Sequence, residues 1–171
     1  EVAALCGAAP IGIAPRRRSA FTFRPPEGVD PSDWPMVADV DEVWYFKPDA
    51  GQLLGSPANA DPVAPHDVQP EELDIALGIH RIEEATTLTI RRPTATWAGL
   101  RSFVRDREIV IGFDDACPAF FWLAAQGGYG IQSAAGASAL AASLITGEGL
   151  APELAAHGVD PAVVAPSRLR P

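Results

Sequence analysis

Residues 120–133, FFWLAAQGGYGIQS, constrain the fold more than any other part of the chain. The stretch opens on an uninterrupted apolar run, residues 120–125, which has the length and the aromatic content of a buried strand. Gln126 and the GGYG sequence that follows it interrupt this run. Residues 131–146 are rich in Ala, Ser and Leu, a composition typical of a helix. We therefore predict a strand, a glycine turn and a helix, in that order.

The predicted turn has the features of a ligand-binding loop. Gly127, Gly128 and Gly130 permit positive φ angles and let a flat ligand approach the backbone. The unpaired N–H groups at the start of the following helix would meet an anionic or electron-rich group there. A tight strand–helix connection with no ligand explains the same pattern, and G-G-x-G by itself does not distinguish the two readings.

The composition is that of a globular protein with a substantial core. The chain has 171 residues, of which 47% are hydrophobic and 20% charged. Its net charge of −9 argues against binding to nucleic acid or to an anionic membrane surface, because both need a basic patch. We find neither an apolar stretch long enough to span a membrane nor a signal-peptide pattern, and we expect a cytoplasmic protein.

The cysteines and histidines do not suggest a metal site. Cys6 and Cys117 are far apart in sequence and form no C-x-x-C motif, so we predict neither a disulfide scaffold nor zinc, and we interpret each as a small hydrophobic residue. The three histidines lack the spacing of metal ligands.

The first half of the chain predicts strands and one helix. Residues 16–23 alternate like a strand, which puts Arg16 and Arg18 on one side and Arg17 on the other. Residues 37–55 read as an antiparallel meander in which Trp44 and Phe46 share a face opposite Tyr45. A helix is predicted from Pro70 to about Ile82 or beyond, and residues 85–90 fit either a continuation of this helix or a strand. Its apolar side is assigned to Leu73 and Leu77, with Ile75, Ile79 and Ile82 as further candidates.

The second half predicts further strands. Residues 96–104 read as a strand with Trp97, Gly99, Arg101 and Phe103 on one side, and residues 109–113 are expected to pair back with it. The prediction for the whole chain is an α+β fold: a mostly antiparallel mixed sheet with a cross-packing helix, plus a terminal strand–turn–helix from a second layer. The chain begins at Glu1 with the end of a helical pattern that stops at Gly7, so we expect a fragment of a longer protein.

Several segments together are specific to one family. TWAGLRSF at 96–103 is followed by FFWLAAQGGYGIQ at 120–132, and RRSAFTF and WYFKPDAGQLLGSP precede them. These residues resemble the C-terminal half of FAD-dependent amine and amino-acid oxidoreductases, the D-amino-acid oxidase/glycine oxidase/sarcosine oxidase superfamily, and most of all its D-arginine dehydrogenase type. The resemblance covers essentially the whole chain.

The resemblance implies a domain division. That family holds the ADP part of FAD with a Rossmann G-x-G-x-x-G motif, which this chain lacks. The division implied is 1–7, the end of an FAD-domain helix; 8–118, the substrate-binding domain; 119–147, a returning flavin-side strand, turn and helix from the FAD-binding layer; and 148–171, a C-terminal tail. The missing partner is then the N-terminal Rossmann FAD domain.

The resemblance also implies an activity. A hydride would pass from the Cα–H of a D-amino acid, or a related amine, to flavin N5, leaving an imino acid. An isolated fragment would be inactive and would not retain FAD. No catalytic residue is assigned. The substrate-binding candidates are Arg101, for the carboxylate, with Tyr45, Arg18 and Gly128, and the cofactor-binding candidates are Gly127, Gly128, Tyr129, Gly130, Ile131 and Gln132.

Two other function classes compete with this one. The same fold can serve as a non-catalytic module that binds a small ligand or a protein. A hydrolase is the weaker alternative, because the chain has no G-x-S-x-G motif and no Ser/His/Asp set. A flavin absorbance spectrum separates the oxidoreductase from both. The amino acid, the choice between oxidase and dehydrogenase, and the oligomeric state stay open.

Overall fold

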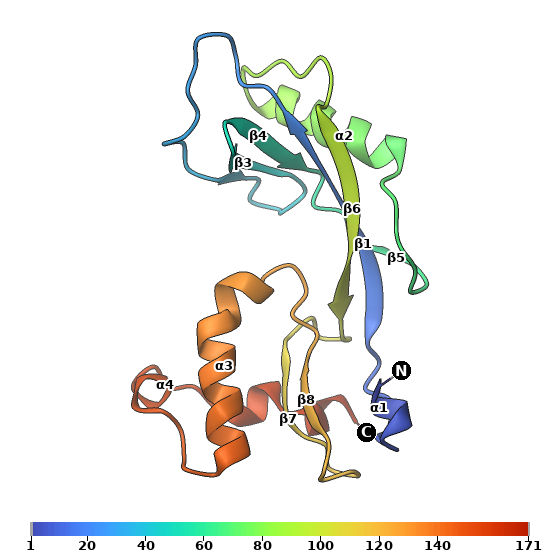
Figure 1. Cartoon of the computed structure of the whole chain (residues 1–171), viewed down its shortest axis with the longest axis vertical. Coiled ribbons are helices and arrows are strands. Elements are labelled where there is room, and N and C mark those ends of the chain that lie inside the picture. Colours follow the sequence, from blue (N-terminus) through green and yellow to red (C-terminus); the bar gives the residue numbers. More distant parts are fainter. Residues whose placement is uncertain (1, 171) are drawn as a thin grey trace. The chain divides into compact units, whose positions relative to one another are not determined.

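The computed structural model describes residues 2–170, which form two compact units. Unit 1 consists of the residues up to Ala14 together with those from Arg101 onward, and unit 2 is Pro15–Leu100. The helices are α1 (Val2–Leu5), α2 (Glu72–Ala85), α3 (Gly130–Thr146), α4 (Pro152–Ala156) and the 3₁₀ turns η1 (Pro161–Val164) and η2 (Pro166–Leu169). The strands are β1 (Ala14–Phe23), β2 (Val37–Ala38), β3 (Tyr45–Asp49), β4 (Gln52–Ser56), β5 (Asp61–Pro62), β6 (Ala95–Phe103), β7 (Val110–Phe113) and β8 (Phe121–Ala124) (Figure 1).

Unit 2 is built on an antiparallel sheet in the order β2-β3-β4-β1-β5, with β6 also pairing with β1. Phe21 of β1 stands opposite Gly55 of β4, and Phe46 of β3 faces the same glycine from the other side. Trp44 and Phe46 stack with ring centroids 6.2 Å apart and are buried, whereas Tyr45 is half-buried. The predicted meander, the facing of its aromatic residues and the α+β class are confirmed.

Helix α2 packs on this sheet through small residues, and Figure 1 shows it lying across the strands. Phe21 is fully buried between the two layers. A Cβ added at Gly55 would come within 2.8 Å of the Phe21 ring, and one added at Gly78 of α2 within 2.9 Å. Glycine at these two positions therefore lets the aromatic ring fill the space between helix and sheet.

The predicted apolar side of α2 is wrong in part. The helix buries Ile75, Gly78 and Ile82, as its 3.6-residue period requires. Leu73 is 75% exposed and Leu77 38% exposed, because they lie outside that stripe. The helix stops at Ala85, so residues 86–90 neither extend it nor form a strand.

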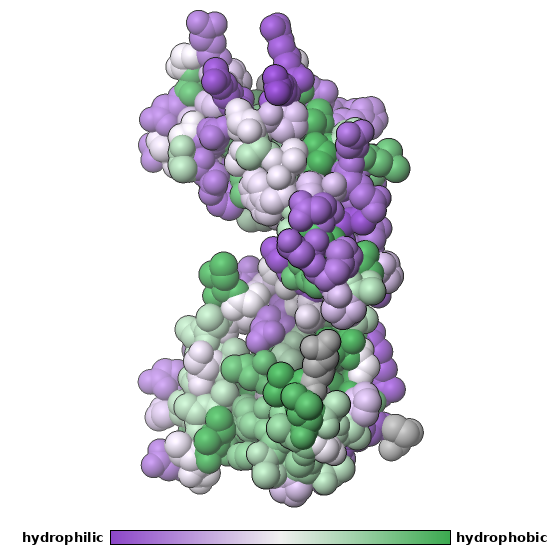
Figure 2. All heavy atoms as spheres, turned by 45° about the vertical axis from the view of Figure 1, so that its right-hand side comes forward, coloured by the Kyte–Doolittle hydropathy of each residue, from purple (hydrophilic) through white to green (hydrophobic). Residues whose placement is uncertain are grey.

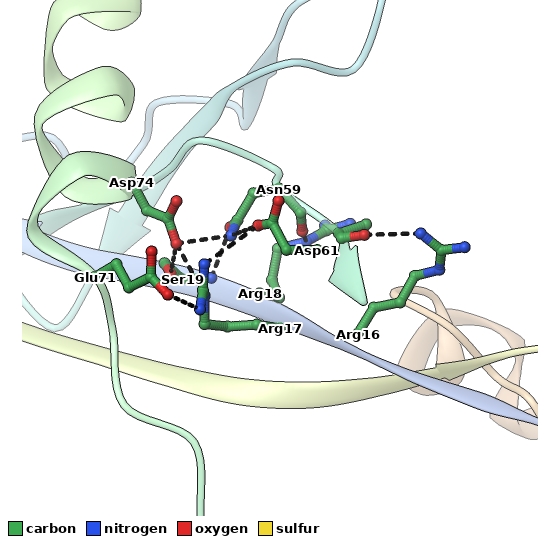
Figure 3. Close-up of polar contacts among 9 residues, drawn as sticks. Arg16, Arg17, Arg18, Ser19, Asn59, Asp61, Glu71 and Asp74 are labelled. Carbon is green, nitrogen blue, oxygen red and sulfur yellow. Dashed lines mark hydrogen bonds and ion pairs between the residues drawn. The ribbon is translucent and has the colours of Figure 1, made fainter. Parts of the chain in front are cut away.

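Polar contacts also fix α2 to β1 (Figure 3). The side chain of Arg17 is buried, whereas Arg16 and Arg18 are half-buried, and the Nε of Arg17 donates to Asp74 Oδ2 at 3.0 Å. The same guanidinium forms an ion pair with Glu71. Asp74 also accepts from the Ser19 hydroxyl at 2.9 Å and from the Asn59 amide at 2.9 Å. A buried cation and a largely buried carboxylate thus compensate one another between helix and sheet.

Unit 1 contains the hairpin of β7 and β8, in which Gly112 faces Trp122. The expected pairing of residues 109–113 with the preceding strand is wrong, because β7 pairs with β8 and β6 pairs with β1. Helix α3 packs Leu140 and Ala141 against Ile111 of the hairpin. Leu154 of α4 and Val164 of η1 pack against the same core.

Candidate functional site

The glycine turn between β8 and α3 is tightly built. Ala125 is 1% exposed and has φ 61°, a left-handed conformation that a residue with a Cβ seldom adopts. Of the three glycines in the turn, Gly127 has a positive φ, 54°. A Cβ at Gly127 would lie 2.8 Å from the Phe103 ring. Backbone strain of this kind persists where the surrounding structure enforces it, and it is concentrated at functional sites.

The turn is bonded to the end of β6. The N–H of Gly127 donates to the carbonyl oxygen of Ser102 at 3.0 Å. Arg101, the residue before Ser102, belongs to the same unit and is half-buried. The sequence-predicted anchor for a carboxylate therefore lies one residue away from the acceptor that holds the turn.

The surroundings of Arg101 differ from those expected. The sequence puts Arg101 in mid-strand on the same side as Trp97, Gly99 and Phe103, which suggests apolar surroundings. Trp97 is instead 40% exposed, and β6 contains no buried residue along its described length. This strand has no closed apolar face, because neither α2 nor α3 packs its buried residues on it.

Helix α3 begins at this turn without a side-chain cap. Tyr129 occupies the N-cap position, and its side chain makes no capping hydrogen bond. The first N–H groups of a helix have no acceptor within the helix, so those of α3 are directed at the turn. They supply donors and a partial positive charge for an electron-rich group.

The side chain of Tyr129 has a structural partner. Its hydroxyl donates to the carbonyl oxygen of Arg107 at 2.5 Å. Burial raises the pKa of this phenol, and the carboxylates of Glu108 and Asp106 raise it further. Tyr129 therefore remains protonated and ties the turn to residues 105–108. Its backbone is engaged as well, because its N–H donates to the Gln126 carbonyl oxygen at 3.2 Å and its carbonyl oxygen accepts from the Ser133 N–H at 3.0 Å.

The other residues of the predicted cofactor-binding set lie around the turn. Gly128 and Gln132 are exposed, and Ile131 is 97% exposed. Gly130 is the first residue of α3 and is half-buried. Within the set from Gly127 to Gln132, the exposed residues are therefore Gly128, Ile131 and Gln132, whereas the N–H groups of Gly127 and Tyr129 donate to Ser102 and Gln126.

Tyr45 and Arg18, the remaining substrate-binding candidates, belong to unit 2. Tyr45 pairs with Ser56 in the sheet. Arg18 is half-buried, and its Nε donates to the Asn59 carbonyl oxygen at 2.6 Å. Their role in a site together with Arg101 stays a prediction.

Sequence reasoning missed a buried carboxylate that organises the hairpin. Asp114 is 1% exposed and accepts from Trp122 Nε1 at 2.9 Å and from the N–H of Cys117 at 2.7 Å. Arg170 donates to the same carboxylate at 2.5 Å. The Trp122 hydrogen bond, followed by those from Cys117 and Arg170, lowers the pKa of Asp114 in spite of its burial. An aspartate after a strand is a turn signal, but its indole partner follows from the register of the hairpin.

An apolar groove runs along β8. It has a volume of about 510 Å³ and is lined by the chain from Val2 to Ile13 and by residues 120–124. Figure 2 shows hydrophobic side chains spread over the unit that carries these segments. Val2 is 68% exposed, Ile13 39% and Leu123 46%. Exposed apolar side chains thus lie on both sides of this groove.

The described residues contain neither a cluster of metal ligands nor a membrane-spanning helix. Within residues 2–170, no three His, Cys, Asp or Glu side chains gather in a way that would hold a metal ion. Across the same residues, no helix combines the length and the apolar character needed to cross a membrane.

With this geometry in place, comparison with known families is decisive. The family described as FAD dependent oxidoreductase, DAO, matches residues 2–144. The chain belongs to this family. The turn bonded to β6 and the start of α3 both lie inside the matched range.

Solved structures share the fold of this DAO-family chain. Glycine oxidase from Geobacillus kaustophilus aligns with 97% of the chain at 19% identity and a TM-score of 0.73. Iminodiacetate oxidase from Chelativorans sp. BNC1 aligns with 95% at 17% identity and 0.75, and L-proline dehydrogenase from P. horikoshii with 94% at 19% identity and 0.70. The chain spans 42%, 42% and 41% of those chains, about two fifths of their length.

The residues of this chain fit one end of FAD. The strained turn and the uncapped start of α3 offer backbone donors to a flat, electron-rich ring. A pyrophosphate needs a glycine-rich strand–turn–helix of the G-x-G-x-x-G kind, and the sequence contains none. The chain therefore suits the flavin ring and carries no motif for the ADP half.

Proposed function

We propose that this chain is the C-terminal, substrate-binding and flavin-side part of an FAD-dependent enzyme that oxidises a D-amino acid, or a related amine, to an imino acid. The observation that carries the proposal is the hydrogen bond from Gly127 to Ser102, which joins the glycine turn to the strand of Arg101. Membership of the DAO family supplies the chemistry, in which bound FAD accepts the hydride from the substrate Cα.

The roles of the residues follow from their chemistry. Arg101 binds the substrate carboxylate, because a guanidinium offers two parallel donors to two oxygens. Tyr45, Arg18 and Gly128 contribute to the substrate pocket. The backbone from Gly127 to Gln132 lies along the flavin, with the N–H groups at the start of α3 stabilising negative charge on the reduced ring.

The names of the structural relatives support an amino-acid substrate. Two are oxidases, named for glycine and iminodiacetate, and one is a dehydrogenase named for L-proline. All three compounds carry a carboxylate beside an amine nitrogen. The D configuration proposed here rests on the resemblance to D-arginine dehydrogenase in residues 96–103 and 120–132.

The same proposal covers the domain organisation. Residues 1–7 end a helix of an FAD domain, 8–118 bind substrate, 119–147 return to the flavin, and 148–171 form a tail. A Rossmann domain preceding this chain holds the ADP half. The complete protein is cytoplasmic, and the 171 residues alone are inactive.

The test is the substitution Arg101→Ala in the longer protein that this proposal requires. Loss of a charge-assisted pair to a desolvated carboxylate costs about 2–5 kcal/mol. The kcat/KM for D-amino acids, measured with an artificial electron acceptor, should therefore fall by about 10²-fold or more. Arg101→Lys should recover part of the loss, because lysine keeps the charge without the fork.

The flavin absorbance of the variant is the control. It should match that of the unsubstituted protein, because Arg101 is assigned to the substrate. An Arg101→Ala variant with an unchanged KM, or one that loses its FAD, would overturn the assignment. A longer protein that binds FAD but oxidises no D-amino acid or amine would overturn the proposed function.

A further inference from the structure

Two cysteines that are 111 residues apart in sequence meet in unit 1. The Sγ of Cys117 lies 3.4 Å from the carbonyl oxygen of Cys6. They are the two cysteines of the chain, and both are free thiols. Cys6 is exposed and Cys117 is half-buried, so a small reagent can reach the pair.

The two thiols lie on segments that are held differently. Cys117 lies in the turn between β7 and β8, where its N–H donates to the buried Asp114 carboxylate at 2.7 Å. Cys6 follows the short helix α1 and precedes Gly7, which has φ 76° and open space around its Cα. The hairpin therefore fixes one sulfur, and the other is on a short exposed turn that can adjust.

The distance is compatible with a covalent bond. Standard bond lengths place a carbonyl oxygen about 2.4 Å, and a cysteine sulfur about 2.8 Å, from the Cα of the same residue, so the Cα atoms of Cys6 and Cys117 lie at most about 8.6 Å apart. Disulfide-bonded cysteines have Cα atoms about 4.4–6.8 Å apart. At the upper bound, the turn after α1 must move by about 2 Å to bring the two Cα atoms into this range.

We propose that Cys6 and Cys117 form a reversible intramolecular disulfide. The oxidant is a low-molecular-weight disulfide such as glutathione disulfide. The Cys6 thiolate attacks one of its sulfurs and releases the first glutathione thiolate. The Cys117 thiolate then attacks the Cys6 sulfur of the mixed disulfide and releases the second. Two protein thiols are oxidised to one disulfide, and one glutathione disulfide is reduced to two glutathione thiols.

The bond would join the two walls of the apolar groove. Cys6 belongs to the segment from Val2 to Ile13 that forms one wall, and Cys117 lies three residues before Phe120, where the other wall begins. Oxidation therefore fixes the spacing of the walls, and reduction releases it. This inference does not depend on the proposed oxidoreductase activity.

The test measures the redox equilibrium of the 171-residue chain with glutathione. The fraction of chains that carry the disulfide is measured at a series of ratios of reduced to oxidised glutathione. It gives the effective concentration of one thiol near the other, once for the native chain and once for the chain in urea. We expect a native value at least about tenfold above the unfolded value, since native contact replaces closure of a long loop. Mass spectrometry should show a monomer lighter by about 2 Da and a linked peptide pair.

The single variants Cys6→Ser and Cys117→Ser are matched controls. Each should stop at a stable glutathione adduct on the remaining cysteine, because no second thiol is present to displace it. A wild-type chain that also stops at the adduct, that links only to a second molecule, or that oxidises no more favourably when native than in urea would overturn the proposal.

Discussion

At the scale of single residues, Asp114 shows how one buried charge is accommodated in a small unit. Its two oxygens accept from an indole, from backbone N–H groups of the following turn and from Arg170. Arg170 also forms an ion pair with Asp115. The last residues that the structure describes are thereby bound to the hairpin that leads into the glycine turn. Each donor favours the ionised carboxylate over the protonated acid.

Asp114→Asn should lower the melting temperature of unit 1 by about 5 °C or more at pH 7, because the amide presents donors where the carboxylate accepts. The folded-state pKa of Asp114 is below its ordinary value of 3.8. Its contribution to stability is therefore present above about pH 4 and disappears as the pH falls through the lowered pKa. Thermal melts should show the difference between variant and wild type shrinking toward zero on acidification.

The matched control is Asp115→Asn, an exposed neighbour that contacts the same Arg170. It should change the melting temperature by less, since a solvated ion pair contributes little. A deficit in Asp114→Asn that is the same at every pH would show that folding does not lower the pKa of the Asp114 carboxyl, and would contradict the prediction.

At the scale of elements, the contact between α2 and β1 depends on both packing and charge. Arg17 is nearly enclosed, and it reaches Asp74 and Glu71 on the helix and Asp61 on β5. Its neighbour Arg16 donates to the Ala60 carbonyl oxygen at 2.9 Å. Arg16 thus binds the loop that contains Ala60, and Arg17 binds helix α2 through Asp74 (Figure 3).

Arg17→Met should destabilise the protein by about 3–5 kcal/mol, because it leaves Asp74 without its cation in a largely buried position. Urea denaturation with the far-UV signal measures this change. Arg16→Met, which removes one hydrogen bond to a carbonyl, should cost about 1 kcal/mol. Equal effects of the two substitutions would mean that the Arg17 network contributes no more than an ordinary hydrogen bond.

The glycine turn and α3 allow a paired prediction. Gly127→Ala should cost about 1–3 kcal/mol, since the new methyl would contact Phe103 in a left-handed backbone. Gly136→Ala, within α3 and with open space around it, should instead stabilise by about 0.5–1 kcal/mol. The same denaturation measurements decide both signs, and a neutral Gly127→Ala would show that the turn is not strained.

Local sequence patterns predict several features of these strands and helices. The alternation of Arg16, Arg17 and Arg18, the stacking of Trp44 on Phe46 and the start of α3 follow from periods of two and of 3.6 residues. The pairing of β7 with β8 and the indole–Asp114 contact do not follow, because they depend on which strands meet in three dimensions. The exposure of Leu73 escaped prediction for the same reason, since several registers of α2 bury enough apolar surface.

At the scale of the whole molecule, the chain divides into an acidic, well-packed sheet unit and a unit with an extended apolar surface. In unit 1, Leu5 is 87% exposed, Ile131 97% and Ile145 57%. Helix α3 packs on the hairpin through Leu140 and Ala141 and leaves these isoleucines uncovered. The family assignment follows from the sequence as a resemblance, whereas the two units and their boundary at Leu100 are properties of the folded chain.

The isolated chain should retain little or no FAD. The binding segment proposed above, residues 127–132, serves the flavin ring alone, and the sequence contains no G-x-G-x-x-G turn that would hold the pyrophosphate. The chain purified in the presence of FAD, then desalted, should show no flavin absorbance. A yellow protein with stoichiometric flavin would contradict this expectation and the domain division proposed above.

The indole of Trp122 gives the molecule a built-in optical reporter. The other three tryptophans, Trp34, Trp44 and Trp97, all lie in unit 2, whereas Trp122 lies in unit 1 and donates to a buried carboxylate. Its fluorescence therefore reports on unit 1 alone. Replacement of Trp122 by phenylalanine leaves the emission of unit 2, and replacement of the other three tryptophans leaves the emission of unit 1. The fluorescence of such variants during heating then shows whether unit 1 or unit 2 melts first.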